Sequence, residues 1–134
     1  MSVKISFNSF RIQKINYNIG QNSETPTNYS MRISKIDMGI SKDKKLAEII
    51  IDGQTKNDKH RILDLKVSYF YSLNYSNDNL EEYTTIKKYL EEYGINTSIV
   101  MYENLIKSVT SLDYNEPMIA NGYDMPGSIK KVED

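Results

Sequence analysis

The clearest pattern in the chain is a period of two, in which every second residue is large and apolar or aromatic. It covers Leu63, Leu65, Val67, Tyr69, Tyr71, Leu73 and Tyr75. Residues i and i+2 share a side of a strand but not of a helix, so the pattern predicts a β-strand with one buried face. The positions between them are polar except for Phe70, which becomes a candidate contact on a solvated face.

Three more strands are expected before this one. Apolar alternation in residues 3–19 and 29–40 changes phase partway, after Ile12 and after Ile33. Each change predicts a β-bulge or a bend in a long strand, and matching changes in neighbouring strands predict a sheet that curves. Residues 46–51 form the third strand, and Asp52-Gly53 is predicted to begin the turn that leads into the strand at residue 61.

The apolar period changes to three and four from Leu80 onward, which predicts helices. Asn79 is the expected N-cap of the first helix, and Gly94 is expected to end it in a left-handed conformation. A second helix is predicted to start near Asn96. Its apolar positions cover more than the ~100° that a surface helix needs, so we expect a second partner, which is more of the sheet, the first helix or another subunit.

Strands followed by helices predict an α+β fold, without the alternating βα loops in which nucleotide and phosphate sites usually lie. A chain of 134 residues fits one domain. We assign residues 1–115 to that domain and residues 116–134 to an apolar tail that contains Gly and Pro and ends in a short charged stretch.

The charges are balanced, with 17 basic and 18 acidic side chains and a net charge of -1. Such a balance provides no field to attract nucleic acid or an anionic membrane, and we expect neither partner. No apolar run approaches the ~20 residues of a membrane span, and the first residues do not resemble a signal peptide. The absence of Cys fits a reducing compartment, so a cytoplasmic protein is expected.

Catalytic parts are not evident in the sequence. His60 is the single His, the six glycines are isolated, and adjacent acids such as Glu91 and Glu92 diverge on a helix. We therefore predict no enzyme, no catalytic residue, no metal site and no cofactor, and we favour an interaction protein. An enzymatic or small-ligand domain built on a cavity between sheet and helices stays a third alternative.

Several strings, in the same order along nearly the whole chain, resemble the SecB family of protein-export chaperones. They are Phe10-Arg-Ile-Gln-Lys-Ile15, the strand Arg61–Leu73, and the stretch from Tyr93 through Ser111. The last loop lacks the family's Leu-Pro-Pro form. The tail after Pro126 lacks the extended acidic, metal-binding end through which the family engages the SecA motor. Whether SecA is a partner is therefore left open. Solitary SecB-like proteins and toxin-antitoxin chaperones belong to the wider group.

The resemblance implies a four-stranded antiparallel curved sheet followed by two C-terminal helices packed on one face. It also implies assembly into dimers or tetramers, with subunit contacts from Tyr83, Ile86, Tyr89, Leu90 and Tyr93.

The activity that the resemblance implies is that of an ATP-independent holdase, which binds unfolded or presecretory polypeptides in apolar grooves. Together with Phe70, the candidate client-binding residues are Ile19, Pro26, Tyr29, Ile95, Met118, Ile119, Tyr123 and Met125. The alternative is a structural or regulatory oligomer that binds one specific protein, such as an antitoxin-like protein.

Overall fold

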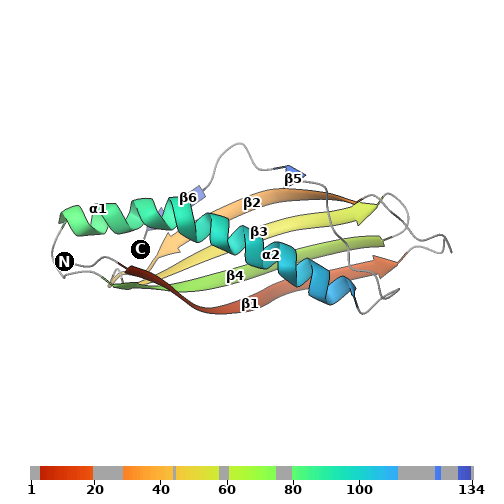
Figure 1. Cartoon of the computed structure of the whole chain (residues 1–134), viewed down its shortest axis with the longest axis horizontal. Coiled ribbons are helices and arrows are strands. Elements are labelled where there is room, and N and C mark those ends of the chain that lie inside the picture. The colour runs from red at the N-terminus through yellow and green to blue at the C-terminus, as the bar shows by residue number, and fades with distance from the viewer. Residues whose placement is uncertain are drawn as a thin grey trace.

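A computed structural model describes residues 4–19, 29–43, 45–57, 61–74, 80–111, 123–124 and 130–133. Its centre is an antiparallel sheet of four long, twisted strands in the order β1-β4-β3-β2 (Figure 1). The strands are β1 (Lys4–Ile19), β2 (Ser30–Ile40), β3 (Leu46–Asn57) and β4 (Arg61–Asn74). Two short strands, β5 (Tyr123–Asp124) and β6 (Lys130–Glu133), pair with β2 in parallel. The predicted α+β class and the four-stranded antiparallel sheet are confirmed.

The phase changes of the first two strands are β-bulges. The register of β1 against β4 shifts between Phe7 and Ser9 and again between Ile12 and Lys14. The register of β2 against β3 shifts between Ile33 and Lys35. Each bulge returns the following apolar residues to the face that carries the buried residues of β4, as the alternation predicted.

The third strand is longer than predicted, because β3 continues through Asp52 and Gly53 in the middle of the sheet. The predicted turn at these two residues is wrong. A Cβ atom on Gly53 would lie 2.7 Å from the carbonyl oxygen of Arg32 and 2.9 Å from the hydroxyl of Tyr102. Glycine is therefore needed here so that a helix side chain can approach the strand closely.

The helical part is one uninterrupted rod. The helix α1 (Leu80–Tyr89), the π-helical turn η1 (Leu90–Gly94) and the helix α2 (Ile95–Thr110) follow one another directly. Gly94 has φ -63° and ψ -45°, so the predicted left-handed stop is wrong. A Cβ atom at Gly94 would lie 3.2 Å from Cδ1 of Ile49, and glycine lets the helix lie close to β3. The predicted N-cap, Asn79, lies outside the described residues.

The helix covers one face of the sheet, as predicted (Figure 1). Its buried residues pack on the inner faces of the strands and include Ile86, Leu90, Ile95, Ile99, Tyr102 and Ile106.

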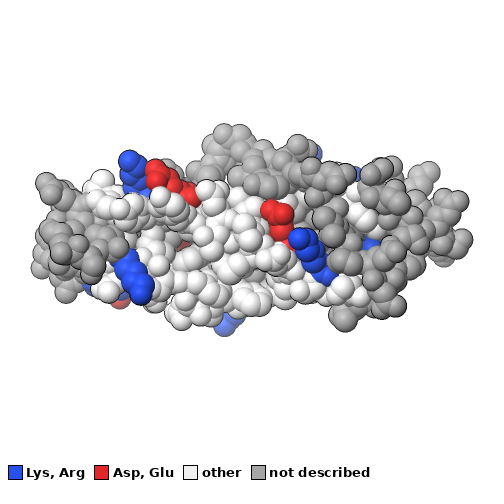
Figure 2. Space-filling view, in the orientation of Figure 1, with Lys and Arg blue, Asp and Glu red and all other residues white. Residues whose placement is uncertain are grey.

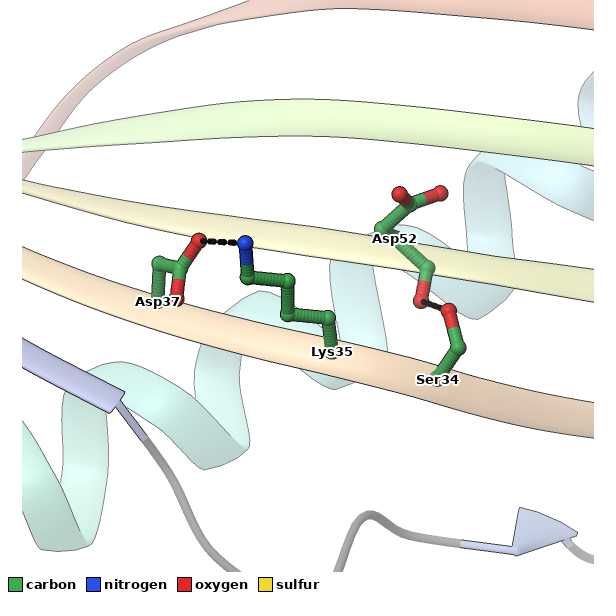
Figure 3. Close-up of polar contacts among 4 residues, drawn as sticks. All are labelled: Ser34, Lys35, Asp37 and Asp52. Carbon is green, nitrogen blue, oxygen red and sulfur yellow. Dashed lines mark hydrogen bonds and ion pairs between the residues drawn. The ribbon is translucent and has the colours of Figure 1, made fainter.

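Polar contacts lie on the outer face of the sheet (Figure 3). Lys35 and Asp37 form an ion pair of 3.3 Å, and the Ser34 hydroxyl donates to the carbonyl oxygen of Asp52 at 2.9 Å. Phe70 lies half-buried on this face, between strands β1 and β3.

Candidate functional site: an apolar groove between β1 and α2

The edge strand β1 exposes apolar side chains on the face that the helix covers elsewhere. Phe7, Phe10, Ile12 and Ile15 are 45%, 50%, 38% and 47% exposed. They stand in register with Tyr71, Tyr69, Val67 and Leu65 of β4, which are buried. Because α2 packs over β3 and β4, the apolar face of β1 extends beyond the cover of the helix.

A groove runs between this strip and the helix, with a volume of about 250 Å³. We call it the β1–α2 groove. It is lined by Phe7, Phe10, Tyr69, Met101, Asn104, Leu105 and Ser108. The surface on this side of the molecule carries few charged side chains (Figure 2). The volume is below the ~300–1,000 Å³ of typical small-ligand sites, so the groove suits individual apolar side chains better than a whole enclosed ligand.

The groove explains the wide apolar stripe of the second helix. Ile99, Tyr102 and Ile106 are buried against the sheet, while Met101 and Leu105 are half-buried and line the groove. Part of the wide stripe therefore lines the groove beside β1, and the second partner that the stripe predicts stays a prediction.

Polar contacts hold α2 to β4 at three points along its length. Near the start of α2, the Tyr71 hydroxyl lies 2.7 Å from Ser98 Oγ and 3.2 Å from the carbonyl oxygen of Gly94. In the middle, the Tyr102 hydroxyl donates to the carbonyl oxygen of Leu65 at 2.8 Å. All of these groups are buried, where an unmade hydrogen bond is costly, so the helix and the groove wall keep a fixed position.

The third point is a buried arginine at the end of α2. Arg61 donates to the Thr110 carbonyl at 2.7 Å, to the Tyr17 hydroxyl at 2.6 Å and to the Tyr29 hydroxyl at 2.9 Å. Burial acts to lower the pKa of Arg61, but the hydrogen bonds to the two tyrosines act to raise it, and the pKa lies above its ordinary value. The charged guanidinium thus links β1, β4 and the C-terminal end of α2. The helix dipole also stabilises a cation at that end.

The role of Arg61 was not predicted, although the sequence carries a signal for it. Arg61 continues the period of two that Leu63 and Leu65 begin, so its side chain belongs to the buried face. A charged residue in phase with a core strand indicates a buried polar network.

Tyr69 is the polar residue of the groove whose hydroxyl is buried. Within the described part of the chain, this hydroxyl has no hydrogen-bond partner. Burial raises the pKa of Tyr69, with a further contribution from Tyr71. Tyr69 thus lines the groove, and its hydroxyl makes no hydrogen bond within the described residues.

None of the predicted client-binding residues that the structure describes lines the groove. Tyr29 is buried against Arg61, Ile95 is buried at the start of α2, and Phe70 lies on the opposite face of the sheet. The backbone of Ile19 ends β1 and that of Tyr123 begins β5. Pro26, Met118, Ile119 and Met125 lie outside the described residues. Client contact by these residues stays a prediction.

The predicted subunit contacts divide into two groups. Tyr83, Ile86 and Leu90 are buried within this chain, because they face the sheet. Tyr89 and Tyr93 are 39% and 64% exposed, and their rings meet edge to face at 5.8 Å. Of the five residues, these two tyrosines offer free surface, and their role in assembly stays a prediction.

Within the described ranges, every helix is too short or too polar to serve as a membrane span. The same residues contain no group of three or more His, Asp or Glu side chains placed to hold a metal ion.

No protein-family model matches the chain, and no curated protein matches its sequence. Solved structures do match. The Mycobacterium tuberculosis SecB-like chaperone Rv1957, in complex with a ChAD peptide from the antitoxin HigA1, superposes with a TM-score of 0.63. The match covers 87% of this chain and 86% of that one, at 10% identity. The fold is SecB-like.

At that identity, the SecB-like fold is what the likeness establishes. A Streptococcus agalactiae protein of unknown function matches over 91% of this chain and 99% of its own at 12% identity, with a TM-score of 0.38. That score is too low to support an argument about the SecB-like fold.

Proposed function

We propose that this SecB-like chain is an ATP-independent holdase, which binds unfolded or presecretory polypeptides in the β1–α2 groove. The observation that carries the proposal is the row of exposed apolar residues on β1, from Phe7 to Ile15, which continues into the groove. A contiguous exposed apolar patch is costly in water and typically marks a binding surface.

The chemistry of the groove suits clients of varied sequence. Met101 has a flexible, polarisable side chain, and Phe7 and Phe10 offer aromatic faces, so that different apolar side chains fit. The strand β1 also lies at the edge of the sheet, where its backbone N–H and C=O groups can pair with an extended client. The Mycobacterium neighbour is a chaperone with a bound antitoxin peptide, which supports a polypeptide as occupant.

The test replaces Phe10 by Ser and compares it with Leu46→Ser. Phe10 and Leu46 are 50% and 48% exposed, but Leu46 is on the outer face of the sheet, away from the groove. We measure binding of a fluorescent, permanently unfolded polypeptide, reduced and carboxymethylated α-lactalbumin, by anisotropy. Phe10→Ser is expected to weaken binding about tenfold, the usual loss at an aromatic contact. Leu46→Ser is expected to bind like the unmodified protein.

An equal loss of affinity in the two variants would contradict the placement of the client in the groove. Failure of the unmodified protein to bind the unfolded polypeptide would contradict the holdase function itself. Thermal unfolding of both variants provides the control for folding. Native α-lactalbumin provides the control for selectivity, because a holdase should not bind it.

A second candidate function is a structural or regulatory SecB-like oligomer that binds one specific protein. The antitoxin peptide bound by the Mycobacterium neighbour favours it. A pull-down from the native cell that returns one stoichiometric partner would support this function, and a broad set of clients would support the holdase.

We place self-association, into a dimer or tetramer, at the exposed pair Tyr89 and Tyr93. A Tyr93→Ser variant with the native mass of a monomer, beside an oligomeric unmodified protein, would support this. An oligomer of unchanged mass would exclude Tyr93 from the contact.

A further inference from the structure

The sheet edge opposite to β1 is occupied by the C-terminal part of the same chain. Tyr123 stands opposite Met31 and Asp124 opposite Arg32, and further along β2 the residues Lys130 to Glu133 of β6 stand opposite Asp37 to Ile40. Both pairings are parallel, and the two segments lie beyond β2 on the side away from β3 (Figures 1 and 3). The described C-terminal residues thus pair with both ends of β2.

The two partners in this pairing differ in how firmly they are held. β2 is a fixed template, because Met31, Ile33, Ile36, Met38 and Ile40 are buried in the core. The C-terminal pairing consists of strands of two and four residues. Parallel pairing is slightly less stable per residue than antiparallel pairing, so a rigid edge is covered by a weakly held segment.

The registers of the two segments also differ. Between β5 and β6 the pairing with β2 shifts by one residue. The two segments therefore do not form one continuous ladder with β2. What they share is backbone pairing, and backbone hydrogen-bonding groups are what an edge strand offers to any extended polypeptide.

We propose that the outer edge of β2 is a second polypeptide-binding site, which accepts an extended segment parallel to β2 and is filled in cis by β5 and β6. The cis segment protects the edge and limits the access of other polypeptides to it. This site lies at the opposite edge of the sheet from the β1–α2 groove and does not depend on the holdase proposal.

The test opens the edge in the full-length chain. The double variant Lys131→Pro/Val132→Pro removes backbone N–H donors from β6, and one of two consecutive residues necessarily points its N–H toward β2. The matched control, Lys131→Ala/Val132→Ala, removes the same side chains and keeps both donors. Hydrogen exchange at residues 37–40 is expected to be about tenfold faster in the Pro variant than in the Ala variant.

The second measurement is binding of a fluorescent peptide with the sequence of residues 123–134. We expect the Pro variant to bind it and the unmodified protein and the Ala variant not to bind it, because their edges are filled. A peptide that carries the same two prolines should not bind. Adding Phe10→Ser to the Pro variant should leave peptide binding unchanged, which separates this site from the groove.

Three results would overturn the proposal. They are equal exchange at residues 37–40 in the Pro and Ala variants, a Pro variant that does not bind the peptide, and a Pro variant whose native mass doubles. The last result would show that a second copy of the chain occupies the opened edge.

Discussion

Replacing Gly53 by Ala tests whether the position of α2 depends on a missing side chain. The new Cβ would lie 2.7 Å from the carbonyl oxygen of Arg32 and 2.9 Å from the Tyr102 hydroxyl. The first atom belongs to the backbone of a neighbouring strand and cannot turn aside. Overpacking of this kind costs about 2 kcal/mol. The reduced freedom of the unfolded chain returns about 0.5 kcal/mol, so the expected net loss is about 1.5 kcal/mol.

Urea unfolding followed by circular dichroism measures this loss, and the melting temperature should fall by about 5 °C. Gly94→Ala is the control. A Cβ at Gly94 would meet the side-chain ends of Leu90 at 2.9 Å and Ile49 at 3.2 Å. Those methyl groups can move, and Ala favours a helix over Gly by about 1 kcal/mol, so we expect little loss or a small gain of stability.

A double-mutant cycle identifies the cause. In a Tyr102→Phe background one of the two close contacts of the new Cβ is gone, so Gly53→Ala should cost about 0.5 kcal/mol less than it does alone. The reasoning is refuted if Gly53→Ala is as stable as the unmodified protein, or if its cost is the same in both backgrounds. Because Tyr102 neighbours the groove residue Met101, a displaced helix should also weaken binding of the unfolded polypeptide.

Three further predictions concern the buried polar groups. Tyr69→Phe should stabilise the protein by about 1 kcal/mol, because it removes a buried hydroxyl that has no partner among the described residues. Tyr102→Phe should destabilise it by about 1 kcal/mol, because it removes the hydrogen bond to the Leu65 carbonyl. Chemical unfolding measures both changes. Burial raises the pKa of both tyrosines above the ordinary 10.0, so above pH 10 the unfolded chain loses these protons before the folded protein does. The free energy of unfolding should therefore be unaffected by the two groups below pH 10 and should fall above it by about 1.4 kcal/mol per tyrosine and pH unit. Tyr69→Phe should reduce this slope by the contribution of one tyrosine. Arg61→Met should cost about 3 kcal/mol in urea unfolding, because it leaves the Thr110 carbonyl without its donor from Arg61, and a loss below 1 kcal/mol would contradict the structural role of the arginine.

The strands and their bulges could be predicted from the sequence because burial follows a local period. The alternation from Leu63 to Leu73 determined which face of β4 is buried, and the phase changes after Ile12 and Ile33 indicated the bulges. A period of two or of 3.6 reflects how side chains leave the backbone, and this geometry does not depend on the rest of the fold.

The two glycines show where local reasoning failed. Gly53 and Gly94 were assigned to a turn and to a helix end, but each lies inside a regular element and makes room for another part of the chain. Glycine is common in turns and also where two segments pack closely, so the residue type alone does not distinguish these two uses. The atoms that decide between them, on Arg32, Tyr102 and Ile49, come from distant positions in the chain.

The order of the four long strands and the helical segment, the buried faces and an α+β fold that resembles the SecB family all follow from the sequence. Tertiary structure alone decided the candidate site. Phe7 and Phe10 are exposed because β1 is an edge strand and α2 packs mainly over β3 and β4. The position of the helix depends on contacts of Tyr71, Tyr102 and Arg61 with residues far along the chain. Which strand lies at an edge is set by pairing between distant segments, and no local period records it.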